Sequence, residues 1–329
     1  MNRLLLRAIR PAALLLAAAA CNNAGSDLGL AALPTNSITT QAFLDRDGSR
    51  LFAPVIDTLF PGARVSLRPA GGGKAIQTVT TNINGIARFD GVALGEYLIT
   101  VDPASLGDSV VVAAIDSSHV KVELSDTNTV SIIRLSFPEL SIRQARLLPA
   151  GKRAFIRGVI LAGVQSFRDT TSHIGDSSGQ IRLTRVSLRG GQTGNNPGDS
   201  VSVLGVASSR AGQPTIDLAV ISRFGQRPAP IPLPVSTGTA ATASGGTLDA
   251  GLVVITGALI SDSATVAPDF RVVGSDGSGP ITVILDGNIN FNRANFRPGR
   301  TMNVRGVLVP DGTGAWVLKP RDVSDAIVF

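Results

Sequence analysis

The sequence predicts an all-β protein in which a β-sandwich is followed by two copies of a small five-stranded barrel. Short apolar runs rich in Val, Ile and Thr alternate with turn residues, and the 329-residue chain contains 36 glycines and 19 prolines, a composition that favours strands and turns over helices. The second observation is an internal repeat. Residues 197–206 and 298–307 share a Pro-Gly turn, an alternating strand and a closing glycine.

Three pairs of glycines extend this repeat with a nearly constant separation of 99 to 101 residues. The pairs are Gly158 and Gly257, Gly179 and Gly279, and Gly205 and Gly306. We therefore expect one module over residues 138–228 and a second over 229–329. The proline-rich joint at 227–234 is expected to be extended and stiff.

Five strands are expected in the second module, and the longest connecting segment precedes the fourth strand. These strands are 252–259, 270–273, 281–285, 302–309 and 315–320. That order matches the oligonucleotide/oligosaccharide-binding (OB) barrel. The turn at 276–279 and the Trp316-containing strand resemble the OB modules of bacterial extracellular nucleases and related envelope proteins. In the nuclease relatives the catalytic domain is separate from the OB module, and this chain has no room for one.

Residues 38–137 show the short, evenly spaced strands of a β-sandwich. Asn84 and Gly85 are expected to form a hairpin turn, and Tyr97 to cover one end of the sandwich. The pattern over residues 80–101 resembles the prealbumin-like modules of bacterial surface proteins, of the carboxypeptidase-regulatory-like and Cna-B or SdrD-B types. Some of those modules bind calcium. Asp45, Asp47 and Asp57 are the available ligands here, although a simple acidic turn is the favoured interpretation.

The N-terminus predicts export. Arg3, Arg7 and Arg10 precede a short apolar run at 12–20, which is too short to span a bilayer. Together with Cys21 this segment (1–21) resembles a bacterial lipoprotein signal, in which the cysteine carries the lipid. An ordinary signal-peptidase site before Cys21 is the alternative. Residues 22–37 are small and polar and are expected to be a tether.

The cysteine and the residue after it predict where in the cell the protein is located. Cys21 is the single cysteine, so no intrachain disulfide forms. Asn22 follows it, and the lipoprotein resemblance then implies the outer membrane rather than the inner one. The expected partners are the membrane, through the lipid, and other envelope proteins.

The charge is unevenly distributed over the three expected units. Net charge is −3 over 22–137, +7 over 138–228 and −1 over 229–329. The excess in the first barrel indicates either an anionic partner or simply solvated arginines. The candidate contacts for an anionic polymer are Arg157, Arg182, Arg185 and Arg189. Alternation along 181–184 predicts that Arg182 points into solvent; Arg185 breaks that phase and is also expected to be solvated.

Candidate catalytic chemistry is sparse. Residues 175–179 fit the Gly-x-Ser-x-Gly pattern beside His173, but an alternating strand follows where a hydrolase needs a helix, so a hairpin turn is predicted. Two histidines and three glutamates offer few general bases. We expect a non-enzymatic protein without a cofactor. It is either an envelope scaffold or spacer, or a binding module that holds nucleic acid or an acidic glycan on the first barrel.

Overall fold

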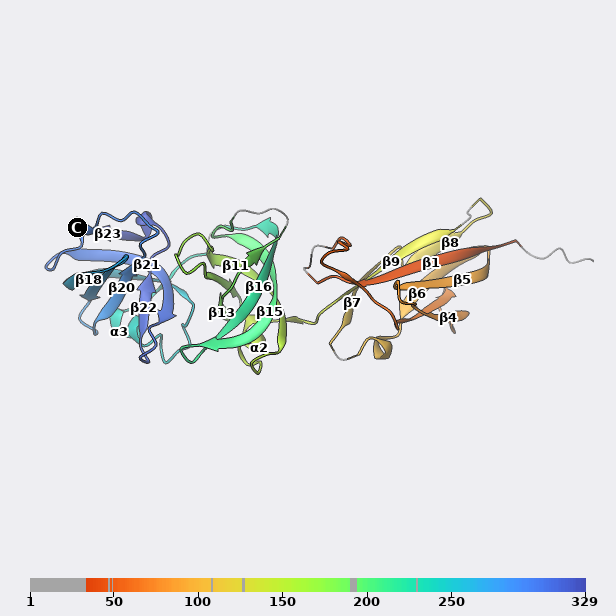
Figure 1. The fold of residues 1–329 in the computed structure, drawn as a ribbon, viewed down its shortest axis with the longest axis horizontal. Coiled ribbons are helices and arrows are strands. Elements are labelled where there is room, and N and C mark those ends of the chain that lie inside the picture. Colours follow the sequence, from red (N-terminus) through yellow and green to blue (C-terminus); the bar gives the residue numbers. More distant parts are fainter. Residues whose placement is uncertain are drawn as a thin grey trace, which may run out of the picture.

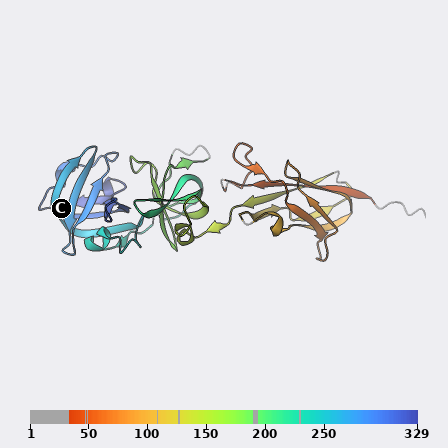
Figure 2. The same cartoon turned by 60° about the horizontal axis from the view of Figure 1, so that its bottom comes forward.

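The computed structural model describes residues 34–46, 48, 50–107, 109–125, 128–189, 194–228 and 230–329. Three β units follow one another along the long axis of the molecule, and the C-terminal end lies opposite the N-terminal sandwich (Figures 1 and 2). The all-β class, with N-terminal sheets and two closed five-stranded barrels, is confirmed. In the described part of the chain, no helix combines the length and apolar character needed to cross a membrane.

Two sheets form the N-terminal unit. The first has the order β2-β1-β9-β7, with β5 also paired to β1, and the second has the order β4-β3-β6-β8. Their bounds are β1 Thr35–Leu44, β2 Thr58–Leu59, β3 Arg64–Pro69, β4 Gln77–Thr80, β5 Ile86–Ala93, β6 Gly95–Val101, β7 Val111–Asp116, β8 His119–Val122 and β9 Thr129–Ser136, with the 3-10 turn η1 Pro103–Ser105. The first strand thus begins within the predicted tether.

Alternate residues of both sheets fill one core. Ile38, Phe89 and Ile133 from the first sheet and Leu67 and Ile99 from the second are almost completely buried. This is the pattern expected when each strand sends every second side chain inward. The sandwich is therefore held by apolar burial.

The turn at Asn84 and Gly85 is not the predicted hairpin. It links β4 to β5, and these strands belong to different sheets, so the chain crosses from one layer to the other. The sequence identified the turn but not which strands pair, because pairing is decided by the core. Tyr97 is buried as expected, and its hydroxyl donates to the carbonyl oxygen of Ala93 at 2.8 Å.

The first barrel closes in the order β11-β12-β13-β16-β15, with β15 returning to β11 and a parallel pair between β13 and β16. Its elements are β10 Glu139–Leu140, α2 Ile142–Arg146, β11 Arg153–Ala162, β12 Ser172–Asp176, β13 Gly179–Leu183, β14 Ser187–Leu188, β15 Asp199–Arg210 and β16 Gln213–Gln226.

The second barrel repeats this topology as β18-β19-β20-β22-β21, and β21 pairs back with β18. All five of its strands were predicted. The elements are β17 Leu233–Pro234, α3 Thr237–Ala241, β18 Leu252–Val266, β19 Asp269–Ser275, β20 Ile281–Leu285, η2 Arg293–Asn295, β21 Thr301–Pro310, β22 Trp316–Lys319, η3 Val323–Asp325 and β23 Ala326–Val328.

A one-turn helix closes each barrel in the same way. In the first barrel, the Asp176 carboxylate accepts a hydrogen bond from the backbone N–H of Ile142 at 2.9 Å. In the second, Asp276 accepts from the N–H of Thr237 at 3.0 Å. Both aspartates sit at hairpin turns, so the hairpin interpretation of residues 175–179 is confirmed. The two aspartates thus stand at the same position of the repeat and have the same role, which is to accept hydrogen bonds from free N–H groups at a helix start.

The repeated glycines Gly205 and Gly306 lie where another strand passes very close. A Cβ atom at Gly306 would collide with the backbone of Lys319 and Pro320, and one at Gly205 would collide with Ile216 and the carbonyl oxygen of Asp217. Neither glycine has a positive φ. The constraint is therefore space within the barrel wall, as expected where two backbones approach.

We predict that Gly306→Val unfolds the second barrel, with a loss of at least about 3 kcal/mol, because the clash is with backbone atoms that cannot move aside. Trp316, the single tryptophan, lies on the adjacent β22. Its fluorescence during urea unfolding measures the effect.

Gly225→Val is the matched control, since φ is not positive there and the nearest atom to an added Cβ is 3.8 Å away. Gly225 lies in the first barrel, so its variant should leave the unfolding transition of Trp316 unchanged. An equally unchanged transition in Gly306→Val would show that the strand approach is not a constraint.

Candidate functional site

The two barrels share a buried contact that covers the expected ligand-binding face of the first. OB folds use their second and third strands and the loop between the first two, which here are β12, β13 and residues 163–171. From this loop Phe167 packs with Leu161, Leu252 and Val307 in an apolar cluster that spans both barrels. Phe167 is 1 % exposed. The face therefore serves barrel packing.

Charged groups surround this cluster. The Lys319 ammonium of the second barrel lies 4.4 Å from the centroid of the Phe167 ring, and 2.9 Å from the carboxylate of Asp286. Arg321 donates to the carbonyl oxygen of Leu161 at 2.9 Å. Each cation is satisfied within the interface, as buried charges require.

Arg182 is not solvated, contrary to the prediction. Ile181 and Leu183 face the core as expected, and Arg182 points to the other side of β13, but it is only 5 % exposed. Burial lowers the pKa of its guanidinium, and Asp249 of the second barrel partly compensates. Alternation predicted the direction of this side chain correctly and could not show that a second barrel lies there.

The other predicted arginines are held differently. Arg185 is solvated, as expected, and it forms a two-point ion pair with Asp217 that holds the pKa of this carboxyl well below its usual range. Arg157 pairs with Glu139 at 3.3 Å. Arg189 has no carboxylate partner among the described residues, and its Nε is buried without a hydrogen bond. The four arginines thus do not form one surface.

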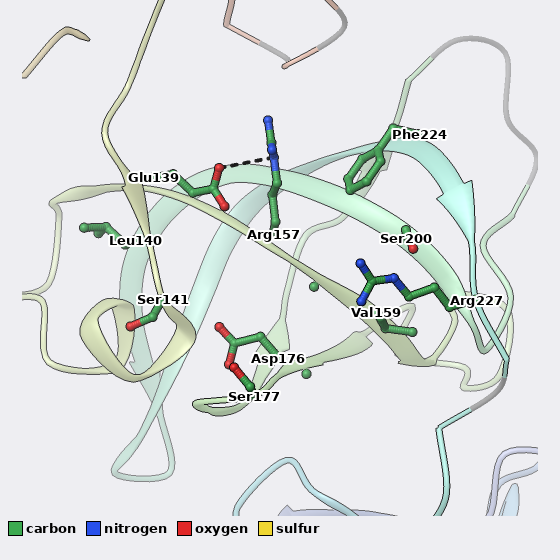
Figure 3. A pocket seen from close by; sticks show the side chains of 12 residues that line it. Glu139, Leu140, Ser141, Arg157, Val159, Asp176, Ser177, Ser200, Phe224 and Arg227 are labelled. Atoms are coloured by element: carbon green, nitrogen blue, oxygen red, sulfur yellow. Dashed lines mark ion pairs between the residues drawn. The ribbon is translucent and has the colours of Figure 1, made fainter. Parts of the chain in front are cut away.

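A groove of about 610 Å³ on the first barrel brings one of them, Arg157, near an aromatic ring (Figure 3). The Arg157 guanidinium lies 5.6 Å from the centroid of Phe224, which is 53 % exposed. Arg227 and Ser200 line the groove beside them. A cation beside an exposed ring can bind anionic or planar groups. Phe224 was not singled out from the sequence as a site residue, because its exposure depends on the strand register.

The groove does not assemble a nucleophile with a base. Its Asp176 carboxylate is engaged by the N-terminus of α2 and by Ser178. His173 lies apart from it, fully buried in the barrel contact.

The candidate calcium ligands are used within their own loop. Asp45 accepts from the N–H groups of Gly48 and Arg50 at 2.7 and 3.0 Å, and Asp57 accepts from those of Arg46 and Ala53 at 2.9 and 2.8 Å. Over the described ranges, no three His, Cys, Asp or Glu side chains group as metal ligands. Asp47 and Cys21 lie outside the described residues.

His173 makes the stability of this contact depend on pH. Neither ring nitrogen has a hydrogen-bond partner, and burial together with the nearby Arg182 and Lys319 lowers its pKa from 6.5 to about 3, against the opposing effect of Asp169. Below pH 6.5 the unfolded chain binds a proton that the folded chain excludes. Stability therefore falls between pH 6.5 and 3 and is fully present above that window.

We predict that His173→Phe removes this pH dependence, which amounts to about 1.4 kcal/mol for each pH unit. Urea unfolding followed by circular dichroism between pH 7.5 and 5 measures it, in a range where aspartates remain ionised. His119→Phe, on the exposed strand β8, is the control and should retain the wild-type slope. Equal slopes for wild type and His173→Phe would contradict the assignment.

Comparisons with known proteins show the fold alone. No family model and no curated protein matches the chain. Among solved structures, a group B streptococcus pilus 2b backbone protein matches at 19 % identity over 31 % of this chain and 41 % of its own, with a TM-score of 0.22. The Bacillus cereus pilin BcpA matches at 11 % over 90 % and 95 %, with 0.26. The p202 HIN1 domain in complex with 12-mer dsDNA matches at 11 % over 57 % and 98 %, with 0.27. The chain thus spans less than half the length of the streptococcal protein and is similar to these structures only as a β architecture.

Proposed function

We propose that the protein is a non-enzymatic scaffold or spacer of the bacterial cell envelope. The observation that carries this proposal is the arrangement of three β units in a row, with the N-terminal sandwich and the second barrel at opposite ends (Figure 1). Such an arrangement displays the last unit away from the point of attachment. In this proposal Cys21 carries a lipid that holds the N-terminus at the outer membrane, and the predicted tether joins it to the sandwich.

The packing between the barrels supports a spacer of fixed length. The cluster around Phe167 is buried and apolar, and the Lys319 and Arg321 contacts lie beside it. Rigid-body contacts of this kind hold neighbouring domains in one relative position, whereas small polar contacts leave them free to move. The resemblance of the sandwich to prealbumin-like surface modules, and of the barrels to envelope OB modules, agrees with this role.

The far end of the second barrel offers an apolar contact surface. Leu259 and Ile327 are 52 % and 53 % exposed. They flank β21 on its two sides, where Leu259 is opposite Thr301 and Ile327 is opposite Asn303. Exposed apolar residues grouped on one face are typical of protein contact sites. We therefore place the contact with another envelope protein here.

We predict that a photo-cross-linking residue at position 327 captures a defined envelope protein in intact cells, and that Leu259→Lys abolishes this product by placing a charge in the contact. A cross-linker at Leu147, which is 80 % exposed on the first barrel, is the control. Products of equal yield from both positions, or none at 327, would contradict the proposed contact.

The groove of Figure 3 favours a second candidate function, the binding of an anionic polymer such as single-stranded nucleic acid or an acidic glycan. Phe224 supplies an exposed ring, and Arg157 and Arg227 supply charge beside it. This site replaces the predicted one on β12 and β13, which the second barrel covers.

For this candidate we predict that affinity for single-stranded DNA falls with salt, with a log–log slope of about −0.7 for each phosphate neutralised. Phe224→Ala should weaken binding by about 1–3 kcal/mol through lost stacking. Gel shifts of the full chain over a salt series, with Arg300→Gln as a control on the second barrel, measure both. If neither single-stranded DNA nor polygalacturonate binds at about 50 mM salt, this candidate fails and the scaffold proposal is unaffected.

A further inference from the structure

A loop of the sandwich rests on the outer wall of the first barrel. Gly48 lies so close to Phe155 and Ser202 that any side chain there would meet both. Phe155, which points away from the barrel core, is consequently only 6 % exposed. The joint between these two units therefore includes a packed contact in addition to the connecting chain.

A cavity of about 320 Å³ lies beside this contact and brings three arginines together from three separate segments. Arg46 belongs to the sandwich loop, where its N–H donates to Asp57 at 2.9 Å. Arg153 begins β11, opposite Val206. Arg189 follows β14, and its N–H donates to the carbonyl oxygen of Ile221 at 3.0 Å.

Some arginines of the first barrel are paired with carboxylates and others are not. Arg157, Arg185 and Arg223 each form an ion pair, with Glu139, Asp217 and Asp199 respectively. By contrast, the described part of the chain supplies no carboxylate to Arg46, Arg153 or Arg189. Arg153 has only a ring contact, 5.2 Å from the centroid of Phe137.

The three arginines of this cavity have no negative charge to balance them among the described residues. Like charges that line one cavity repel each other. Arg46 and Arg189 are half-buried, whereas Arg153 is exposed and its charge is partly screened by water. The Nε of Arg189 is buried and has no hydrogen-bond partner, which leaves a charged donor unsatisfied. An anion between the three groups would remove both penalties. Guanidinium groups bind phosphate and carboxylate through pairs of parallel N–H donors, which compact cations cannot provide.

We propose that this joint cavity is a binding site for an oxyanion, a phosphate or a carboxylate group, which bridges Arg46 of the sandwich to Arg153 and Arg189 of the barrel. The remaining wall consists of apolar side chains, among them Leu204, Val206 and Val220. It suits a ligand whose anionic group is attached to a compact apolar part. Since the anion contacts both units, its binding also fastens the sandwich to the barrel. The site is independent of the scaffold role and of the groove around Phe224.

Isothermal titration of the full chain with inorganic phosphate and with citrate, at constant ionic strength set by chloride, tests the site. We expect saturable binding of at least one of the two ions, and the tighter one identifies the oxyanion class. Arg189→Gln and Arg46→Gln should each weaken binding at least tenfold. Arg185→Gln, which removes the same charge from the same barrel outside the cavity, should leave affinity within twofold.

Arg189→Lys keeps the charge and removes the paired donors, so it should weaken binding even where Arg189→Gln fails to fold. Equal affinity in wild type and Arg46→Gln would overturn the bridging site. Absence of binding in wild type would overturn it as well.

Discussion

The contact of Phe167 with the second barrel is the constraint on which the C-terminal two thirds depend. It closes an apolar cluster between two barrels that each already have a complete core. This contact covers the face of β12 and β13 that OB folds use for ligands, and His173 and Arg182 are buried in it. Any ligand of the first barrel must therefore approach its outer wall, where Arg157 and Phe224 lie.

Much of this architecture could be predicted from residues alone. The strands of the second barrel follow from alternation and from the turn at Asp276, since these signals are local in the chain. The equivalence of the two barrels follows from glycines such as Gly205 and Gly306, because each marks a close backbone approach that no other residue permits. Strand alternation, turn residues and glycines were thus sufficient to predict the strands and turns of the barrels.

What could not be predicted depends on how separate units meet. Alternation directed Arg182 away from its own core, but nothing in residues 181–184 indicates that another barrel covers that side. The exposure of Phe224 depends on the strand register within its barrel. The convergence of Arg46 with Arg189 requires the relative placement of segments more than 100 residues apart. Asn84 shows the same limit within the sandwich, since its turn was recognised while the pairing of its flanking strands was not.

The contact between the barrels is head-to-tail, because it uses β12 and its preceding loop on one copy and β21 and β22 on the other. Contacts of this kind use different surfaces on the two copies, so repeated use of them builds either a closed ring or an open row of units. In the second barrel the cross-strand pair equivalent to His173 and Arg182 is Val273 and Thr282, which remain partly exposed. One repeat length after Phe167 stands Ala267, in the short turn between β18 and β19. The second barrel therefore presents no aromatic side chain at this position of the repeat, and the contact that Phe167 makes has no counterpart on its own outer face.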